Sequence, residues 1–246
     1  MGSSGFAAWH KGDRGFALTF ALVAWAAVFV GFYPAVSGRW RGEADYPAPL
    51  ILQIHVFAFA AWLGLLSIQV LLIRARRVEW HRALGIAGAG LIPVLVITGI
   101  GAEVFSQRFY SPRYAENLRF FIFPLTTMLS FLAVAVAAVR YRSQPSAHKR
   151  LMMVATALIL VAAFNRWWGE TIYEVMGDAY FGTLVRNVIG PDLLIAAIAG
   201  YDLVTRRRIH PVLLVAAPAI LAAQLAATAT YHSSWWPGVA RTLAGL

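Results

Sequence analysis

Residues 47–73 read PAPLILQIHVFAFAAWLGLLSIQVLLI and contain no aspartate, glutamate, lysine or arginine. Because a helix rises about 1.5 Å per residue, roughly 20 such residues cross the ~30 Å hydrocarbon core of a bilayer. Of the 246 residues, 60% are hydrophobic and 13% are charged, which leaves little for a soluble domain. The sequence predicts an all-α membrane protein, with residues 1–246 as a single transmembrane domain. Its bundle of seven transmembrane helices is expected over residues 15–36, 47–73, 83–102, 119–140, 151–174, 185–205 and 211–231.

Basic residues concentrate at the N-terminus and in alternate turns, near residues 74–82, 140–150 and 206–210. The other turns mix arginine with acidic residues such as Glu43 and Glu174. By the positive-inside rule, the N-terminus lies in the cytoplasm and the C-terminus outside, as in a multi-pass protein of the bacterial inner membrane. The net charge of +10 then faces anionic lipid headgroups of the bilayer, and no nucleic-acid partner is expected. Cysteine is absent, which excludes disulfides and thiolate sites.

Three of the basic turns are similar to one another: RARRVEWHRALG (residues 74–85), RYRSQPSAHKRLM (residues 140–152) and TRRRIHPVLL (residues 205–214). Each follows one apolar stretch and carries a histidine shortly before the next. This pattern predicts three helical hairpins stacked after the first helix, with their histidines at one depth.

The three histidines of these turns are His81, His148 and His210. Two of them can ligate a haem iron, and all three together can hold a divalent metal. The surrounding arginines repel a bound cation, which counts against both kinds of site. The cofactor therefore stays unassigned, with haem b as the alternative and no metal site predicted. The simpler alternative is that each histidine opens a helix at the level of the lipid headgroups.

Two charged residues interrupt apolar stretches that are otherwise too short to span. The fifth helix is long enough only if it carries Arg166, and the sixth only if it carries Asp192. Counted from the basic turns, these residues lie about 24 Å and about 21 Å deep. Because a lone charge at such depth is costly, the sequence predicts that Arg166 and Asp192 pair in the outer third of the bundle.

Further polar residues are expected at a similar height. They predict an intramembrane polar cluster on the outer side, made of His55, Arg166, Glu170, Asp192 and Gln224. This cluster either locks helices together or forms a cavity that binds or moves a small ligand or protons. For His55 alone, an interior histidine held by hydrogen bonds is the simpler interpretation.

The basic turns also carry a resemblance to known proteins. HRALG (residues 81–85), HKRLM (148–152) with NRWW (165–168), and YDLVTRRRIHPVLL (201–214) resemble bacterial inner-membrane proteins that carry a domain of unknown function. The resemblance extends over roughly residues 48–215. It implies a multi-helix membrane protein and no established activity.

A weaker likeness is to the transmembrane di-haem b-type cytochromes. These proteins place a histidine before a Leu-Gly helix start and a His-Pro-Val-Leu at another, as at His81 and His210 here. They bind haem at two depths, whereas on the outer side His55 has only His232, at the interface, as a candidate partner. The likeness therefore implies a single haem between two basic-turn histidines, in a protein that exchanges electrons with quinone.

The sequence assigns no catalytic residue. It contains no hydrolase, zinc-protease or phosphate-binding motif, and it leaves open whether the protein is an enzyme. Three hypotheses follow: a binding or transport protein that uses the outer polar cluster, a b-type haem redox protein, and a scaffold subunit of a larger membrane complex.

Overall fold

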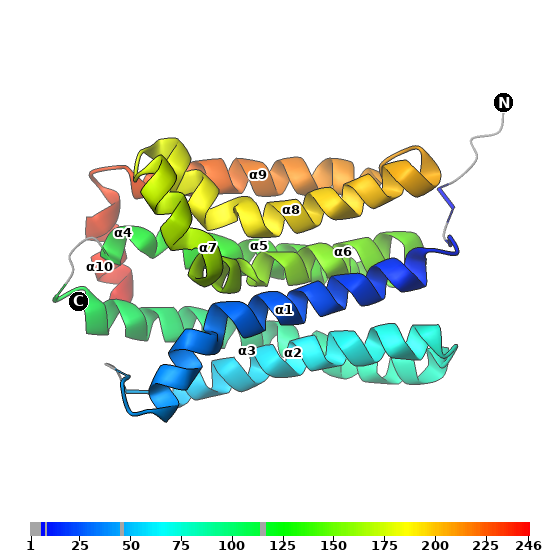
Figure 1. The fold of residues 1–246 in the computed structure, drawn as a ribbon, viewed down its shortest axis with the longest axis horizontal. Helices are drawn as coiled ribbons and strands as arrows, with labels where there is room; N and C mark the ends of the chain where they lie inside the picture. The colour runs from blue at the N-terminus through cyan, green and yellow to red at the C-terminus, as the bar shows by residue number, and fades with distance from the viewer. Residues whose placement is uncertain (1–5, 8, 45–46, 114–116) are drawn as a thin grey trace.

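The computed structural model describes residues 6–7, 9–44, 47–113 and 117–246, and every element in these ranges is helical. The helices are α1 (Asp13–Trp40), α2 (Leu50–Arg74), α3 (Val78–Tyr110), α4 (Asn117–Phe120), α5 (Ile122–Arg140), α6 (Pro145–Ile159), α7 (Val161–Met176), α8 (Tyr180–Arg206), α9 (Pro211–Tyr231) and α10 (Trp236–Ala244). The long helices lie side by side along the long axis of the molecule (Figure 1). The all-α prediction is confirmed.

Within the described residues, six stretches of helix are long and apolar enough to cross a membrane: α1, α2, α3, residues 117–140, α8 and α9. A seventh span arises if α6 and α7 count as one, and these two helices are bent by 49° at their junction. The predicted multi-pass bundle is thus confirmed. The predicted unbroken helix over residues 151–174 is wrong, because the backbone turns at Leu160, whose N–H bonds to the Ala157 carbonyl at 3.1 Å.

The helix α7 leaves the direction of α6 to pack against α1 and α8. Two glycines make this approach possible. A Cβ atom at Gly31 of α1 would overlap the backbone of Ala163, and one at Gly190 of α8 would overlap the ring of Phe164. Small residues at such contacts let helix backbones come closer than larger side chains allow.

Consecutive helices pack together in the pairs α2–α3, α5–α6 and α8–α9, with α7 inserted before the third pair. The three connections and the start of α1 lie at one end of the bundle (Figure 1). We call it the histidine end, because it carries His81, His148 and His210. The short helices α4 and α10 lie at the opposite end.

The interior of the bundle is rich in small side chains, and its outer surface carries large apolar ones. Phe29, Ile97 and Val204 are each at least two-thirds exposed, as expected for side chains that face lipid. The fully buried alanines include Ala24, Ala27, Ala135, Ala138 and Ala155. Close helix contacts of this kind stabilise membrane bundles through van der Waals packing.

Two helices at the histidine end begin earlier than predicted. The helix α3 starts at Val78 and α6 starts at Pro145, so His81 and His148 lie within the first two turns of their helices. Only His210 precedes its helix, where it caps α9. The two helical histidines therefore have fixed backbones and side-chain directions set by the helix surface.

Candidate functional site

A cavity of about 210 Å³ lies between α1, α2, α3, α6 and α8 at the histidine end. Gly85 and Gly88 of α3 border this space together with Leu65 of α2. We call it the histidine cavity, because His81 and His148 lie in its wall. Its mainly apolar lining includes Phe16, Trp62, Leu66, Ile92, Met153 and Ile198. Since an engineered apolar cavity of roughly 150 Å³ binds benzene, this space has room for a group of about the size of one aromatic ring.

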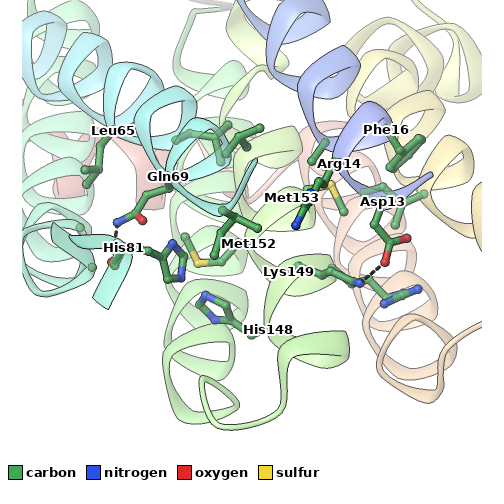
Figure 2. A pocket seen from close by; sticks show the side chains of 18 of the residues that line it. Asp13, Arg14, Phe16, Leu65, Gln69, His81, His148, Lys149, Met152 and Met153 are labelled. Carbon is green, nitrogen blue, oxygen red and sulfur yellow. Dashed lines mark hydrogen bonds and ion pairs between the residues drawn. The ribbon is translucent and has the colours of Figure 1, made fainter. Parts of the chain in front are cut away.

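His81 of α3 and His148 of α6 lie next to each other at the edge of the histidine cavity (Figure 2). Their ring centroids are 6.4 Å apart and the ring planes are inclined by 81°. His148 Nδ1 lies 2.8 Å from the carbonyl oxygen of Ala138. Because a carbonyl only accepts, Nδ1 carries the proton and donates, and Nε2 of the neutral ring keeps its lone pair. This arrangement is typical of a histidine that binds metal through Nε2.

Three buried polar atoms in the cavity wall have no hydrogen-bond partner within the described chain: Arg14 Nε, Gln69 Oε1 and His81 Nδ1. The amide of Gln69 is held in place, because its Nε2 donates to the His81 carbonyl at 3.1 Å. Buried polar groups are nearly always paired. These atoms can form hydrogen bonds with water or with a bound molecule.

An ionic network borders the cavity and is made of Asp13, Lys149, Arg150, Asp202 and Arg206. Asp13, at the start of α1, accepts from Lys149 Nζ at 2.6 Å and from Arg206 at 2.8 Å. The hydroxyl of Tyr201 donates to its other carboxylate oxygen at 2.9 Å. One carboxylate thus ties the start of α1 to α6 and α8.

The second part of the network is the buried pair of Arg150 and Asp202, which are 1% and 0% exposed. The guanidinium donates through two nitrogens to the two carboxylate oxygens, with an Nε–Oδ2 distance of 2.7 Å. Asp202 also accepts from the backbone N–H of His210 at 3.2 Å. A buried ion pair recovers its desolvation cost only with such bidentate geometry and additional hydrogen bonds.

His210 belongs to this network and not to the histidine pair. Its Nδ1 accepts from the N–H of Val212 at 3.2 Å, so Nε2 carries the proton and donates to Ser146 Oγ at 3.2 Å. Both ring nitrogens are thereby engaged. Burial, followed by the charge of the Arg150 guanidinium, lowers the pKa of His210 to about 4. The ring is therefore neutral at physiological pH.

Of the three basic-turn histidines, the structure brings only His81 and His148 into ring contact. In the part of the chain that the structure describes, no group of three or more histidine and acidic side chains is arranged to hold a metal ion. A site at the histidine end therefore has two imidazoles to offer.

The predicted ion pair between Arg166 and Asp192 is not formed. Arg166 of α7 is turned toward α1, where its guanidinium lies 4.7 Å from the centroid of the Phe32 ring. Asp192 of α8 is turned toward α9, where Gln224 Nε2 donates to Asp192 Oδ1 at 2.9 Å. Counting residues along straight helices gives a height, but the bend before α7 and the rotation of each helix decide the partner.

The other members of the predicted outer cluster are distributed over the bundle. His55 of α2 bonds through Nδ1 with Thr98 Oγ1 of α3 at 3.2 Å, as an interior histidine held by hydrogen bonds. Glu170 is exposed on α7. Among the five residues of the cluster, a side-chain hydrogen bond joins Asp192 with Gln224.

Sequence reasoning misses the ionic network, although a signal for it is present. Asp13 and Asp202 are acidic residues in the first turn of α1 and near the end of α8, both within otherwise basic termini. An acidic residue that interrupts a basic helix end needs a local partner, and the neighbouring arginines and Lys149 supply it.

Comparison of the chain with protein-family models, with curated proteins and with solved structures yielded no match. The geometry of the histidine cavity therefore carries the functional assignment.

Proposed function

We propose that this multi-pass membrane protein binds haem b, with His81 and His148 as the two axial ligands of the iron. The observation that carries the proposal is the histidine pair: two imidazoles from α3 and α6, with centroids 6.4 Å apart, in the wall of a largely apolar cavity. Imidazole nitrogens bind metals at about 2.0–2.1 Å, so two such bonds and the two rings span a distance of this order. Haem iron ligated in this way transfers single electrons.

The surroundings of the histidine pair support this ligand. The mainly apolar wall of the cavity suits the apolar faces of the macrocycle. Arg14 and Arg74, also in the wall, match the carboxylates of the haem propionates. His148 is already oriented by the Ala138 carbonyl, with Nε2 available to the iron.

The proposal includes an orientation in the membrane. Arginines gather in the three connections of the histidine end, among them Arg76, Arg142 and Arg207. The positive-inside rule supports a cytoplasmic position for this end in a bacterial inner membrane. Anionic headgroups then balance the exposed guanidinium groups.

A visible absorption spectrum tests the proposal, with protein purified from cells that have an ample haem supply. We expect a Soret band and stoichiometric haem b, and we expect His81→Ala and His148→Ala each to lose most of the haem. His55→Ala is the matched control and keeps its haem, because His55 bonds to Thr98 outside the pair. Gel filtration and thermal unfolding show whether each variant is folded. A colourless wild-type protein, or full haem content in both folded variants, would overturn the proposal.

Copper in place of haem is a second outcome that would overturn it. Met152 follows His148 by one helical turn, which places both side chains on the same face of α6, and it lies beside the histidine pair (Figure 2). Two imidazoles with a thioether suit Cu(I). Elemental analysis of the same preparation distinguishes the two metals.

A second candidate function is the binding of a lipid-soluble ligand with a polar head, such as a quinone. The unpartnered Arg14 Nε and Gln69 Oε1 favour it, because they offer a donor and an acceptor to such a head group. Solvent extraction of purified protein followed by mass spectrometry should then recover the ligand from wild-type protein and much less from Gln69→Leu. Equal recovery from both proteins would exclude this binding mode.

A further inference from the structure

Asp192 lies near the middle of α8, a helix that is long and apolar enough to span the membrane. Its side chain meets α9, where Gln224 Nε2 donates to Asp192 Oδ1 at 2.9 Å. The amide orients the carboxyl group but carries no charge. A carboxylate at this depth is costly unless a positive charge or a proton neutralises it, so intramembrane carboxyl groups mark proton and ion pathways.

The charged groups on the helices around Asp192 are engaged elsewhere. The helices packed against α8 are α6, α7 and α9, and α9 contains no acidic or basic residue. Arg186 of α8 pairs with Asp178 at 3.0 Å, and the guanidinium of Arg166 lies over Phe32. The remaining charged residues of α6 and α7 are Lys149 and Arg150, in the ionic network, and Glu170 and Glu174, which are exposed. No salt bridge reaches Asp192 within the described chain.

A small cavity of about 20 Å³ lies beside Gln224, between α5, α8 and α9. Thr127, Ser130 and Asn187 contribute polar side chains to its wall. Gln224 is 9% exposed, and its Oε1 is buried without a partner in the described chain. One water needs roughly 10–15 Å³ and two to four polar partners, so this cavity fits a single water bonded to Gln224 Oε1.

We propose that Asp192 is an intramembrane proton-binding site, held at Oδ1 by Gln224, the residue that also borders the small cavity. Gln224 occupies Oδ1, which leaves Oδ2 to carry the proton. The step is a simple protonation: a carboxylate and a proton give a neutral carboxyl group, and no other reactant is consumed. This site shares no residue with the haem proposal, so either one can fail without the other.

Labelling with dicyclohexylcarbodiimide tests the proposal. This apolar reagent adds to a carboxyl group that carries a proton: the proton moves to one carbodiimide nitrogen, the carboxyl oxygen bonds to the central carbon, and the acyl group then migrates to nitrogen to leave a stable acylurea. We expect mass spectrometry of protein in liposomes to find the label on Asp192, and its yield to fall several-fold as the pH is raised. Asp192→Asn should lose it.

Glu103 provides the matched control. It is a second intramembrane carboxyl beside a glutamine, since Gln107 Nε2 donates to it at 2.6 Å. We expect Glu103→Gln to leave the labelling of Asp192 unchanged.

Infrared spectroscopy covers the case in which the reagent cannot reach the site. A carbonyl stretch of a carboxylic acid that disappears in Asp192→Asn and shifts in Gln224→Leu supports the proposal even without labelling. The absence of both the label and this band would overturn it. Protection by Na⁺ at constant pH would also overturn it, because the site would then bind sodium.

Discussion

Charged residues at the histidine end neutralise one another, whereas Asp192 and Arg166, farther along the bundle, contact neutral groups. At the histidine end, Asp13 contacts two cationic side chains and Arg150 forms a bidentate pair with Asp202. Inside the spans, Asp192 is bonded by an amide and the guanidinium of Arg166 lies over an aromatic ring. The difference arises because several helix ends converge at the histidine end, so opposite charges from α1, α6 and α8 come within reach.

This contrast separates two roles for polar residues in one bundle. A saturated network, in which every charge has a partner, fixes helices relative to one another and offers little to a ligand. Atoms that keep a lone pair without a hydrogen-bond partner in the described chain, such as His148 Nε2 and Gln69 Oε1, can still bind a ligand. The proposed sites are therefore the histidine cavity and the Asp192 position, whereas the ionic network at the histidine end holds α1, α6 and α8 together.

The largest effect is expected from breaking the buried pair. Arg150→Met or Asp202→Leu alone should lower the free energy of unfolding by about 3–5 kcal/mol, because each leaves a buried charge without its partner. The double variant should recover most of that loss. Thermal or denaturant unfolding in detergent measures both. Arg41→Ala, which removes an exposed pair with Glu43, is the control and should change nothing measurable. Single variants as stable as wild type would show that the network is dispensable.

A smaller loss is expected when Asp13 becomes neutral. Asp13→Asn keeps the shape of the side chain but weakens its hydrogen bonds with Lys149 and Arg206, and bonds to charged groups are worth about 1.5–3 kcal/mol. The same unfolding assay measures the change, with Asp178→Asn at its half-exposed pair as the comparison. An effect no larger than that of Asp178→Asn would argue against a role for Asp13 in anchoring α1.

The spans could be predicted from the sequence because a helix needs about 20 consecutive apolar residues to cross the hydrocarbon core of a bilayer. Hydrophobicity does not report helix direction, and for that reason the bend at Leu160 and the separate environments of Arg166 and Asp192 escaped prediction. The pairing of His81 with His148 depends on how α3 and α6 rotate about their axes. Spacing placed three histidines at one end, but only contacts in three dimensions single out two of them.

The pH dependence of stability probes His210, which lies within the network. Its pKa falls from 6.5 to about 4 on folding, so the unfolded chain binds more protons between these values. The stabilising contribution of neutral His210 is therefore complete above pH 6.5 and is lost as the pH falls toward about 4. Unfolding temperatures measured across this window should decline less steeply for His210→Gln than for wild type. Parallel curves would show that other groups control the acid sensitivity.

The smallest change in the free energy of unfolding is expected for a substitution of Arg166. This substitution also tests most directly whether Arg166 and Asp192 have separate partners. Arg166→Gln removes a cation–π contact with Phe32, which is worth less than about 1 kcal/mol at an exposed site. A double-mutant cycle of Arg166→Gln with Asp192→Asn should give a coupling energy within about 0.5 kcal/mol of zero, since the two side chains have separate partners. The same cycle on Arg150 and Asp202 should give several kcal/mol. If the first coupling approached the second, the charges within the spans would pair after all, and Asp192 would have no need of a proton.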